Sequence, residues 1–251
     1  MKENRVDIVV YDIIKAVREV MLKHDVTHSE YLAAQAFLAT FLSAPAYEIP
    51  LALDIFFDAT VHDAEMTHRK GSMTNTQGPY FKGDCPTVTT ELKVLPEKNG
   101  DPLIIEGRVM DVDGRPIPGA ELFVWHSDPD GNYSGFCDYM PKNDYYRGRV
   151  HIPEDGNFRL LSTVPYAYTI PHNGPTGILL KAMGRHPWRP AHLHFIVNAD
   201  GFMQHVTQIY FREGEYNDTD CAESVRADLI YDFEFSDGKK VIRKDFYLDR
   251  I

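Results

Sequence analysis

The sequence predicts a mainly β protein, in which a β-sandwich or barrel follows a helical N-terminal segment. Two observations lead to this prediction. From about Leu103 onward, short β-like runs alternate with turn residues, and Asp-Gly and Pro-Gly clusters mark tight turns between them. Many short strands at close spacing with few helices are typical of a sandwich or barrel. In the first part of the chain, apolar residues recur at helical spacing instead.

Three helices are expected in this first part. Apolar residues recur at helical spacing over residues 6–21. Residues 27–30, Thr-His-Ser-Glu, have the form of a capping box, and the helix that it starts runs on through the alanine-rich residues 31–44. Two prolines then interrupt, and residues 51–66 are expected to form a third helix. Such apolar helices could pack on a sheet, on one another or on a second subunit.

Six segments in the second part are the expected strands. They lie at residues 103–112, 120–127, 157–164, 191–199, 206–211 and 244–249. Residues 71–102 are expected to be a loop-rich connector that leads into them. We therefore divide the chain into a helical and linking region at residues 1–80 and a β domain at residues 81–251.

Composition and charge limit the classes of function. The 251 residues can bury a sizeable core, and 43% hydrophobic and 25% charged residues are ordinary values for a soluble globular protein. A formal net charge of −11 argues against nucleic acid or an anionic membrane as the main partner. No apolar run suggests a membrane span, and no signal peptide is evident. Three widely spaced cysteines are typical of reduced thiols in a cytoplasmic protein.

The stretch AHLHFIV contains the first indication of chemistry. Strand alternation puts His192 and His194 on one face. Leu193, Phe195 and Val197 then lie on the other face, where they are expected to fill the core. Two imidazoles on one face of a strand can converge on one metal ion. A pair of ordinary buried or surface histidines gives the same pattern, so the pair alone does not decide.

Two histidines need further ligands. The nearest acid, Asp200, stands in a turn, and no cysteine has a metal-binding spacing, so a zinc site has little support. Tyrosine is the other candidate. A phenolate is a hard anionic donor that suits ferric iron, and a strong Lewis acid is needed to deprotonate the phenol at neutral pH. Tyr133 and Tyr168 lie in loops of the β part, where functional residues concentrate, although core or surface packing remains the alternative for each.

A resemblance to a known family rests on four segments. They are residues 107–135, 164–177, 184–195 and 205–211. They resemble the intradiol ring-cleavage dioxygenases, most closely the catechol and chlorocatechol 1,2-dioxygenases. The order and spacing of four ligand positions fit, with 35 residues from Tyr133 to Tyr168, 24 to His192 and two to His194. The resemblance covers nearly the whole chain. It implies a transthyretin-like β-sandwich as the catalytic domain, at residues 81–251.

The resemblance also implies the cofactor and the reaction. A mononuclear non-haem Fe(III), one per subunit, would be held by Tyr133, Tyr168, His192 and His194 with a solvent hydroxide. The enzyme would insert both atoms of O2 into a catechol or chlorocatechol and cleave between the two hydroxylated carbons. The product would be a cis,cis-muconate, as in aromatic degradation. In the family mechanism Tyr168 leaves the metal when the substrate binds as a dianion, and it can accept a substrate proton.

Further site residues follow from the same resemblance. Arg189 matches the family arginine thought to stabilise carbanion character in the substrate, and Gln208 matches a glutamine of the same pocket. Tyr168, rather than the nearby Tyr166, matches the second tyrosine of the family's P-x-x-Y pattern. The remaining expected substrate contacts are Leu51, Asp54, Ile55, Pro79, Tyr80 and Cys221. Two of these stand at positions i and i+4 of the third predicted helix, where ordinary core packing is the alternative.

Several alternatives stay open at this stage. Details of the connector and of the short N-terminus resemble the chlorocatechol branch more than the catechol branch, so we expect substituted catechols to be turned over at least as well as catechol. Hydroxyquinol 1,2-dioxygenase and a 1,2-dioxygenase of unsubstituted catechol are the alternatives within the family. Outside it stand a non-catalytic β-sandwich binding module and an extradiol-type enzyme, which needs a carboxylate beside two histidines. The family further implies a homodimer through the N-terminal helices, and several relatives hold a phospholipid between them.

Overall fold

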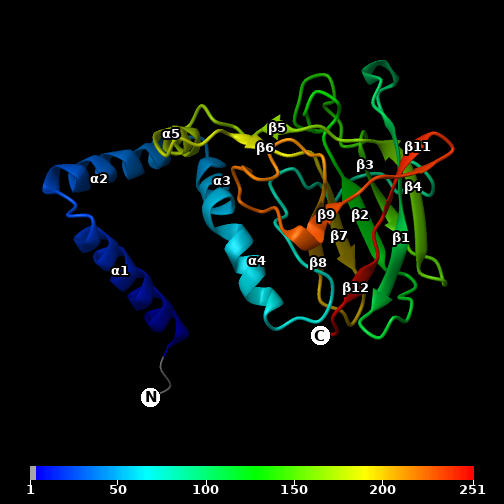
Figure 1. Ribbon diagram of the computed structural model, residues 1–251, viewed down its shortest axis with the longest axis horizontal. Helices are drawn as coiled ribbons and strands as arrows, with labels where there is room; N and C mark the ends of the chain where they lie inside the picture. Colours follow the sequence, from blue (N-terminus) through cyan, green and yellow to red (C-terminus); the bar gives the residue numbers. More distant parts are fainter. Residues whose placement is uncertain (1–3) are drawn as a thin grey trace. The chain divides into compact units, whose positions relative to one another are not determined.

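The computed structural model describes residues 4–251 in two compact units, one up to Glu48 and one from Ile49 onward (Figure 1). The first three residues of the predicted region 1–80 lie outside the described part. The first unit holds α1 (Arg5–Lys23) and α2 (His28–Ser43). The predicted capping box is confirmed. The Thr27 side chain accepts the Glu30 N–H, and the Glu30 carboxylate accepts the Thr27 N–H at 2.8 Å.

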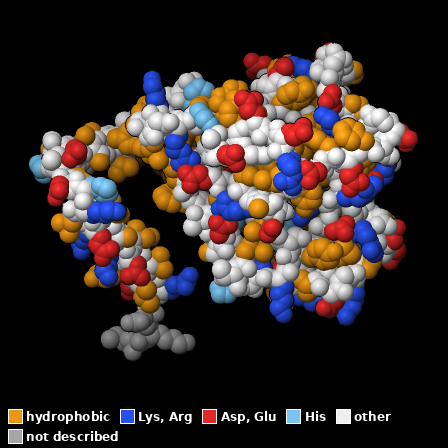
Figure 2. All heavy atoms as spheres, viewed as in Figure 1, with side chains coloured by type: hydrophobic (Ala, Val, Ile, Leu, Met, Phe, Trp, Pro, Cys, Tyr) orange, Lys and Arg blue, Asp and Glu red, His pale blue; other side chains and the backbone are white. Residues whose placement is uncertain are grey.

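Apolar side chains of α1 and α2 lie on the surface. Neither helix, both wholly within the described residues, buries a side chain. Figure 2 shows hydrophobic side chains on the visible face of both helices. Val6 is 64% exposed and Leu42 is 85% exposed. A helix of this kind is stable in water only when a partner covers its apolar face. None of the described helices is both long enough and apolar enough to cross a bilayer.

The third predicted helix is present but is not uniform. It is made of α3 (Glu48–Leu53), the π-helical turn η1 (Asp54–Asp58) and α4 (Ala59–Met66). The helix begins at Glu48, before the expected residue 51. Pro50 does not interrupt it, because backbone N–H groups in the first turn of a helix have no partner within the helix, so proline is tolerated there. The π-helical turn widens the helix by one residue. Leu51, Ile55 and Ala59 form its buried face.

The second unit contains two five-stranded sheets. One sheet has the order β10 (Glu234–Ser236), β11 (Lys239–Arg243), β1 (Pro102–Asp111) and β12 (Phe246–Leu248), and β4 (Asn157–Thr163) also pairs with β1. The other has the order β3 (Arg147–His151), β2 (Glu121–Trp125), β7 (His192–Asn198), β8 (His205–Phe211) and β9 (Ile230–Tyr231). A short ribbon pairs β5 (Tyr168–Thr169) with β6 (Trp188–Arg189), and α5 (Pro175–Ala182) lies between these two strands in the sequence. The mainly β fold is confirmed, as a sandwich rather than a barrel.

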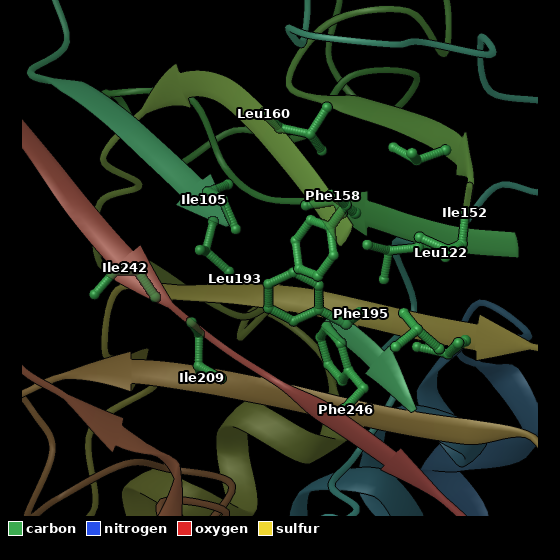
Figure 3. Packing of buried hydrophobic residues seen from close by; sticks show 14 of the residues in the cluster. Ile105, Leu122, Ile152, Phe158, Leu160, Leu193, Phe195, Ile209, Ile242 and Phe246 are labelled. Carbon is green, nitrogen blue, oxygen red and sulfur yellow. The ribbon is translucent and has the colours of Figure 1, made fainter. Parts of the chain in front are cut away.

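The main core lies between the two sheets. Figure 3 shows Phe158 and Leu160 of one sheet and Leu193 and Phe195 of the other within one hydrophobic cluster. Val197 belongs to the same cluster, so the predicted core face of β7 is confirmed. His192 and His194 are buried on the opposite face, outside this core. Because a slip of one residue would exchange the two faces, burial of the apolar face fixes the direction of both histidines.

All six predicted strand segments contain a strand, but several strands were not predicted. The hairpin of β10 and β11 is the clearest omission. Its turn is Asp237-Gly238, with φ of +48° and +73°, the signature of a type I′ turn. The Asp-Gly pair was therefore a usable signal. Strands β5, β6 and β9 have two residues each, too few for a periodic pattern.

Candidate metal centre and pocket

Four buried side chains from three separate parts of the chain converge behind β7. Tyr133 comes from the turn after β2, Tyr168 begins β5, and His192 and His194 stand on β7. Tyr133 Oη lies 3.2 Å from His194 Nε2, which lies 3.0 Å from His192 Nε2. The Tyr168 ring centroid is 5.2 Å from that of Tyr133 and 5.6 Å from that of His192. The structure thus brings together the four residues predicted to hold a metal.

The two imidazoles have the form that binds a metal. His192 Nδ1 lies 2.7 Å from the Pro190 carbonyl oxygen, to which it donates, so Nε2 keeps its lone pair. Burial, together with the charge of Arg189, lowers the pKa of His192 to about 3. Burial and the neighbouring His192 lower the pKa of His194 well below its ordinary value. Both rings are therefore neutral, and two nitrogens at 3.0 Å are readily bridged by a cation.

The two phenols complete the donor set. Burial raises the pKa of Tyr133 well above its ordinary value, and the adjacent Tyr168 adds to the effect. Burial also raises the pKa of Tyr168, while Arg189 opposes this. A cation of high charge is needed to turn such phenols into phenolates. Among the described residues, no group of three or more His, Cys, Asp or Glu side chains could hold a metal ion, so the extradiol-type donor set is not formed there. Two imidazoles and two phenols suit ferric iron.

Close backbone contact sets the position of the two tyrosine-bearing segments. Gly131 has φ +80°, and a Cβ at this position would lie 2.8 Å from Tyr168 Cβ. The turn that holds Gly131 is closed by Asp128, whose carboxylate accepts the N–H of Asp130 at 3.0 Å and of Asn132 at 2.8 Å. The turn before Tyr133 therefore lies directly against Tyr168.

Two further residues, neither of them predicted, shape the centre. Trp125 stands opposite His194 in the β2–β7 register and stacks on it, with 4.6 Å between ring centroids and 6° between planes. Arg147 donates to the Tyr80 carbonyl at 3.0 Å and to the Ser134 carbonyl at 2.7 Å. It thereby joins the connector to the turn of Tyr133. Both residues are buried, and a strand pattern alone does not distinguish them from ordinary core residues.

A narrow pocket opens beside the centre. It is lined by Leu51, Asp54, Ile55, Thr76, Gly78, Pro79, Tyr80, Tyr168, Ile170, Pro171, Arg189 and Ala222. Six of the eight predicted substrate contacts are in this lining. Gln208 and Cys221 are not: Gln208 lies behind Arg189 and accepts from it at 3.0 Å, and Cys221 is fully buried beside Ala222.

The pocket also separates two neighbouring tyrosines. Tyr168 is 6% exposed and lines the pocket, whereas Tyr166 is 44% exposed and lies outside it. Asp54 stands in η1 and also lines the pocket. Burial, with repulsion from Asp58, raises the pKa of Asp54 to about 6 although Arg189 opposes the shift.

A buried site of two imidazoles and two phenols, with an adjacent pocket on a β-sandwich, has the features of a non-haem iron enzyme. The model of the family described as Dioxygenase matches residues 76–249. Chlorocatechol 1,2-dioxygenase from Pseudomonas sp. (strain P51) is 39% identical over 98% of this chain and 97% of its own. A crystal structure of chlorocatechol 1,2-dioxygenase from Pseudomonas putida superposes with a TM-score of 0.91 at 41% identity, covering 98% of this chain and 99% of the other.

A hydroxyquinol 1,2-dioxygenase from Pseudomonas putida DLL-E4 has a similar fold, with a TM-score of 0.86 at 28% identity, over 100% of this chain and 94% of the other. The chain therefore belongs to the dioxygenase family, as an intradiol catechol dioxygenase. Iron of the non-haem type is the cofactor of this family, and the donor set described above fits it.

Proposed function

We propose that the protein cleaves chlorinated and other substituted catechols between their hydroxylated carbons, with O2 as co-substrate and one Fe(III) per subunit. Tyr133, Tyr168, His192 and His194 are the proposed ligands. The observation that carries the proposal is the convergence of these four buried side chains beside one pocket. The 39% and 41% identity to two chlorocatechol 1,2-dioxygenases supports the choice of substrate class.

Bound Fe(III) supplies a Lewis acid that polarises the catechol oxygens and favours their deprotonation. The remaining work falls to the chain itself. Tyr168 lines the pocket, so its phenolate oxygen is in a position to take a substrate proton. Leu51, Ile55 and Pro79 provide an apolar wall that orients the ring and excludes water. Arg189 supplies a fixed positive charge where negative charge develops on the ring.

The residues that line the pocket indicate which ring substituents of a catechol it can accept. Leu51, Ile55 and Ile170 offer apolar contact to a chlorine or a methyl group. Asp54 is the one carboxyl group of the lining, and it can accept a hydrogen bond from a third ring hydroxyl. Hydroxyquinol is therefore the second candidate substrate. A series of kcat/KM values decides: catechol ahead of the chlorocatechols by about tenfold, roughly 1.4 kcal/mol, contradicts the chlorocatechol assignment.

The colour of the purified protein tests the metal site. Ferric tyrosinate absorbs in the visible region, whereas zinc or ferrous iron gives no such band. We expect a red to burgundy protein whose band shifts when catechol is added without oxygen. Tyr168→Phe should alter the band of the protein before substrate is added, while Tyr166→Phe, a matched change outside the pocket, should leave that band intact. The reverse result contradicts the ligand assignment.

We also propose a homodimer formed through the helices of region 1–80, with region 81–251 as the catalytic domain. The exposed apolar side chains of α1 and α2 support this, since a partner must cover them. Sedimentation tests the dimer, and a mass of one subunit contradicts it.

A phospholipid held between the helices is tested by mass spectrometry of an organic extract. A cytoplasmic location is proposed because all three cysteines are free thiols.

A further inference from the structure

We propose that Asp220 is a positioning residue for the reaction: it holds the guanidinium of Arg189 by one edge, so that the nitrogen Nη1 is directed to the metal centre. The inference rests on the proposed function, in which Arg189 acts at the pocket. Asp220 stands on the loop after β8, outside the four segments that carry the family resemblance. It does not line the pocket itself, and Arg189 is the charged group of the lining that it holds.

The contact between the two side chains is a side-on pair. Asp220 Oδ1 lies 3.1 Å from Arg189 Nε, and Asp220 Oδ2 lies 3.2 Å from Nη2. Two parallel hydrogen bonds fix both the place and the rotation of a guanidinium, which a single bond does not. Both side chains are buried, at 3% and 4% exposed, so water does not compete for the donors.

The same edge of Arg189 is held by three further oxygens. Nη2 also lies within hydrogen-bonding distance of Gln208 Oε1 at 3.0 Å, Tyr210 Oη at 3.1 Å and Ser224 Oγ at 2.5 Å, which share its two hydrogens with Asp220. Nη1 has a different neighbour. It lies 3.5 Å from His192 Nε2, one of the four converging donor atoms. The guanidinium is thus held at Nε and Nη2 and faces the centre with Nη1.

Asp220 is itself fixed by its own loop. Its Oδ1 accepts the Ala222 N–H at 3.2 Å, and its Oδ2 accepts the Ser224 N–H at 3.2 Å and the Ser224 hydroxyl at 2.7 Å. The carboxylate therefore cannot turn without breaking the loop that carries it. Gln208 is anchored in the same way, because its amide donates to the Thr76 carbonyl at 2.7 Å. Thr76 lines the pocket, so the network reaches the pocket wall.

The opposite charges of Asp220 and Arg189 stabilise the ion pair. Burial alone would raise the pKa of Asp220, but Arg189 outweighs it and lowers the pKa to about 2. Burial alone would lower the pKa of Arg189, but Asp220 outweighs it, and the pKa stays above its ordinary value. Each group therefore favours the charged form of the other. Asp220 thus compensates a cation that would otherwise stand unpaired beside a ferric centre.

A purely structural ion pair is the competing explanation, and kinetics distinguishes the two. Asp220→Asn keeps the shape of the side chain but removes its charge and turns one acceptor into a donor. We expect the variant to retain iron and its visible band, while kcat per bound iron falls by about 10²-fold, the effect of roughly 1 Å of misplacement. KM should change by much less, since the apolar side chains that contact the ring, Leu51, Ile55 and Pro79, are untouched. Ser224→Ala, a milder change in the same network, should lower kcat by about fivefold, the effect of a net loss of about 1 kcal/mol when its hydroxyl is removed.

Two controls complete the experiment. Asp232→Asn breaks an exposed ion pair in which Arg212 Nε lies 2.6 Å from Asp232 Oδ1. This variant should leave kcat unchanged. In an Arg189→Lys background, Asp220→Asn should lower kcat by no more than about twofold relative to Arg189→Lys alone, because the guanidinium that Asp220 positions is no longer present. Additive effects in this cycle, or Ser224→Ala with unchanged kcat per iron, overturn the inference even if Asp220→Asn does not fold. Absence of the visible band and of catechol cleavage from the unaltered protein refutes the proposed function instead.

Discussion

Replacing Gly131 by alanine should damage the metal centre through backbone contact alone. Gly131 has φ +80°, which costs an L-residue about 1–2 kcal/mol. The new Cβ would also lie 2.8 Å from Tyr168 Cβ, too close for two carbon atoms, so one segment must move. Overpacking of this kind costs about 1–3 kcal/mol. The sum is a loss of roughly 2–5 kcal/mol in the free energy of unfolding, with displacement of Tyr168 from the centre.

Gly114 provides the matched control for this prediction. It has φ +81°, and a Cβ there meets no atom within 4 Å. Gly114→Ala should therefore lose only the backbone cost, about 1–2 kcal/mol, and keep its visible band and its activity. Urea unfolding measures the loss of stability, and the absorption spectrum of the iron-loaded protein measures the centre. Equal losses in the two variants, with an unchanged spectrum in both, would refute the reasoning.

Three further predictions concern the core, the metal and the pocket. Leu193→Ala should cost about 2–5 kcal/mol in urea unfolding yet leave the visible band intact, because Leu193 faces the core; a bleached protein contradicts this. Removing the iron should bleach the protein and lower its Tm, whereas an unchanged Tm contradicts a bound cation. Asp54 holds its proton more tightly when folded, with a pKa of about 6, so its contribution to stability is lost as pH rises through that value. Asp54→Asn should therefore gain about 1–2 kcal/mol relative to the unaltered protein between pH 4 and pH 7.5, and a constant difference contradicts this.

Much of the fold was predictable because the sheets leave periodic patterns. The two faces of β7 follow from alternation alone, and the capping box at Thr27 follows from local hydrogen bonding. The π-helical turn at Asp54 was not predictable, because one inserted residue leaves apolar spacing nearly unchanged. The strands β5 and β6 depend on pairing between segments twenty residues apart, which local patterns do not record.

The metal centre was less predictable from the sequence than the fold. Residue types alone indicated a two-histidine site of undecided metal, with Tyr133 and Tyr168 among the candidate ligands. Only the family resemblance assigned all four residues to one ferric site. Trp125 and Arg147 were missed, because their roles come from contacts across strands and loops. Asp220 was missed because its partner is 31 residues away in the sequence. Such residues become visible only when the chain is folded.

The stacking of Trp125 on His194 also gives the molecule an optical reporter of its own. The chain has two tryptophans. Trp125 is 2% exposed and lies 4.6 Å from the imidazole, whereas Trp188 is 37% exposed and stacks on Tyr216. Iron entering the centre should quench the emission of Trp125 far more than that of Trp188. Loading of the protein can therefore be followed in real time by fluorescence, without substrate and without a label.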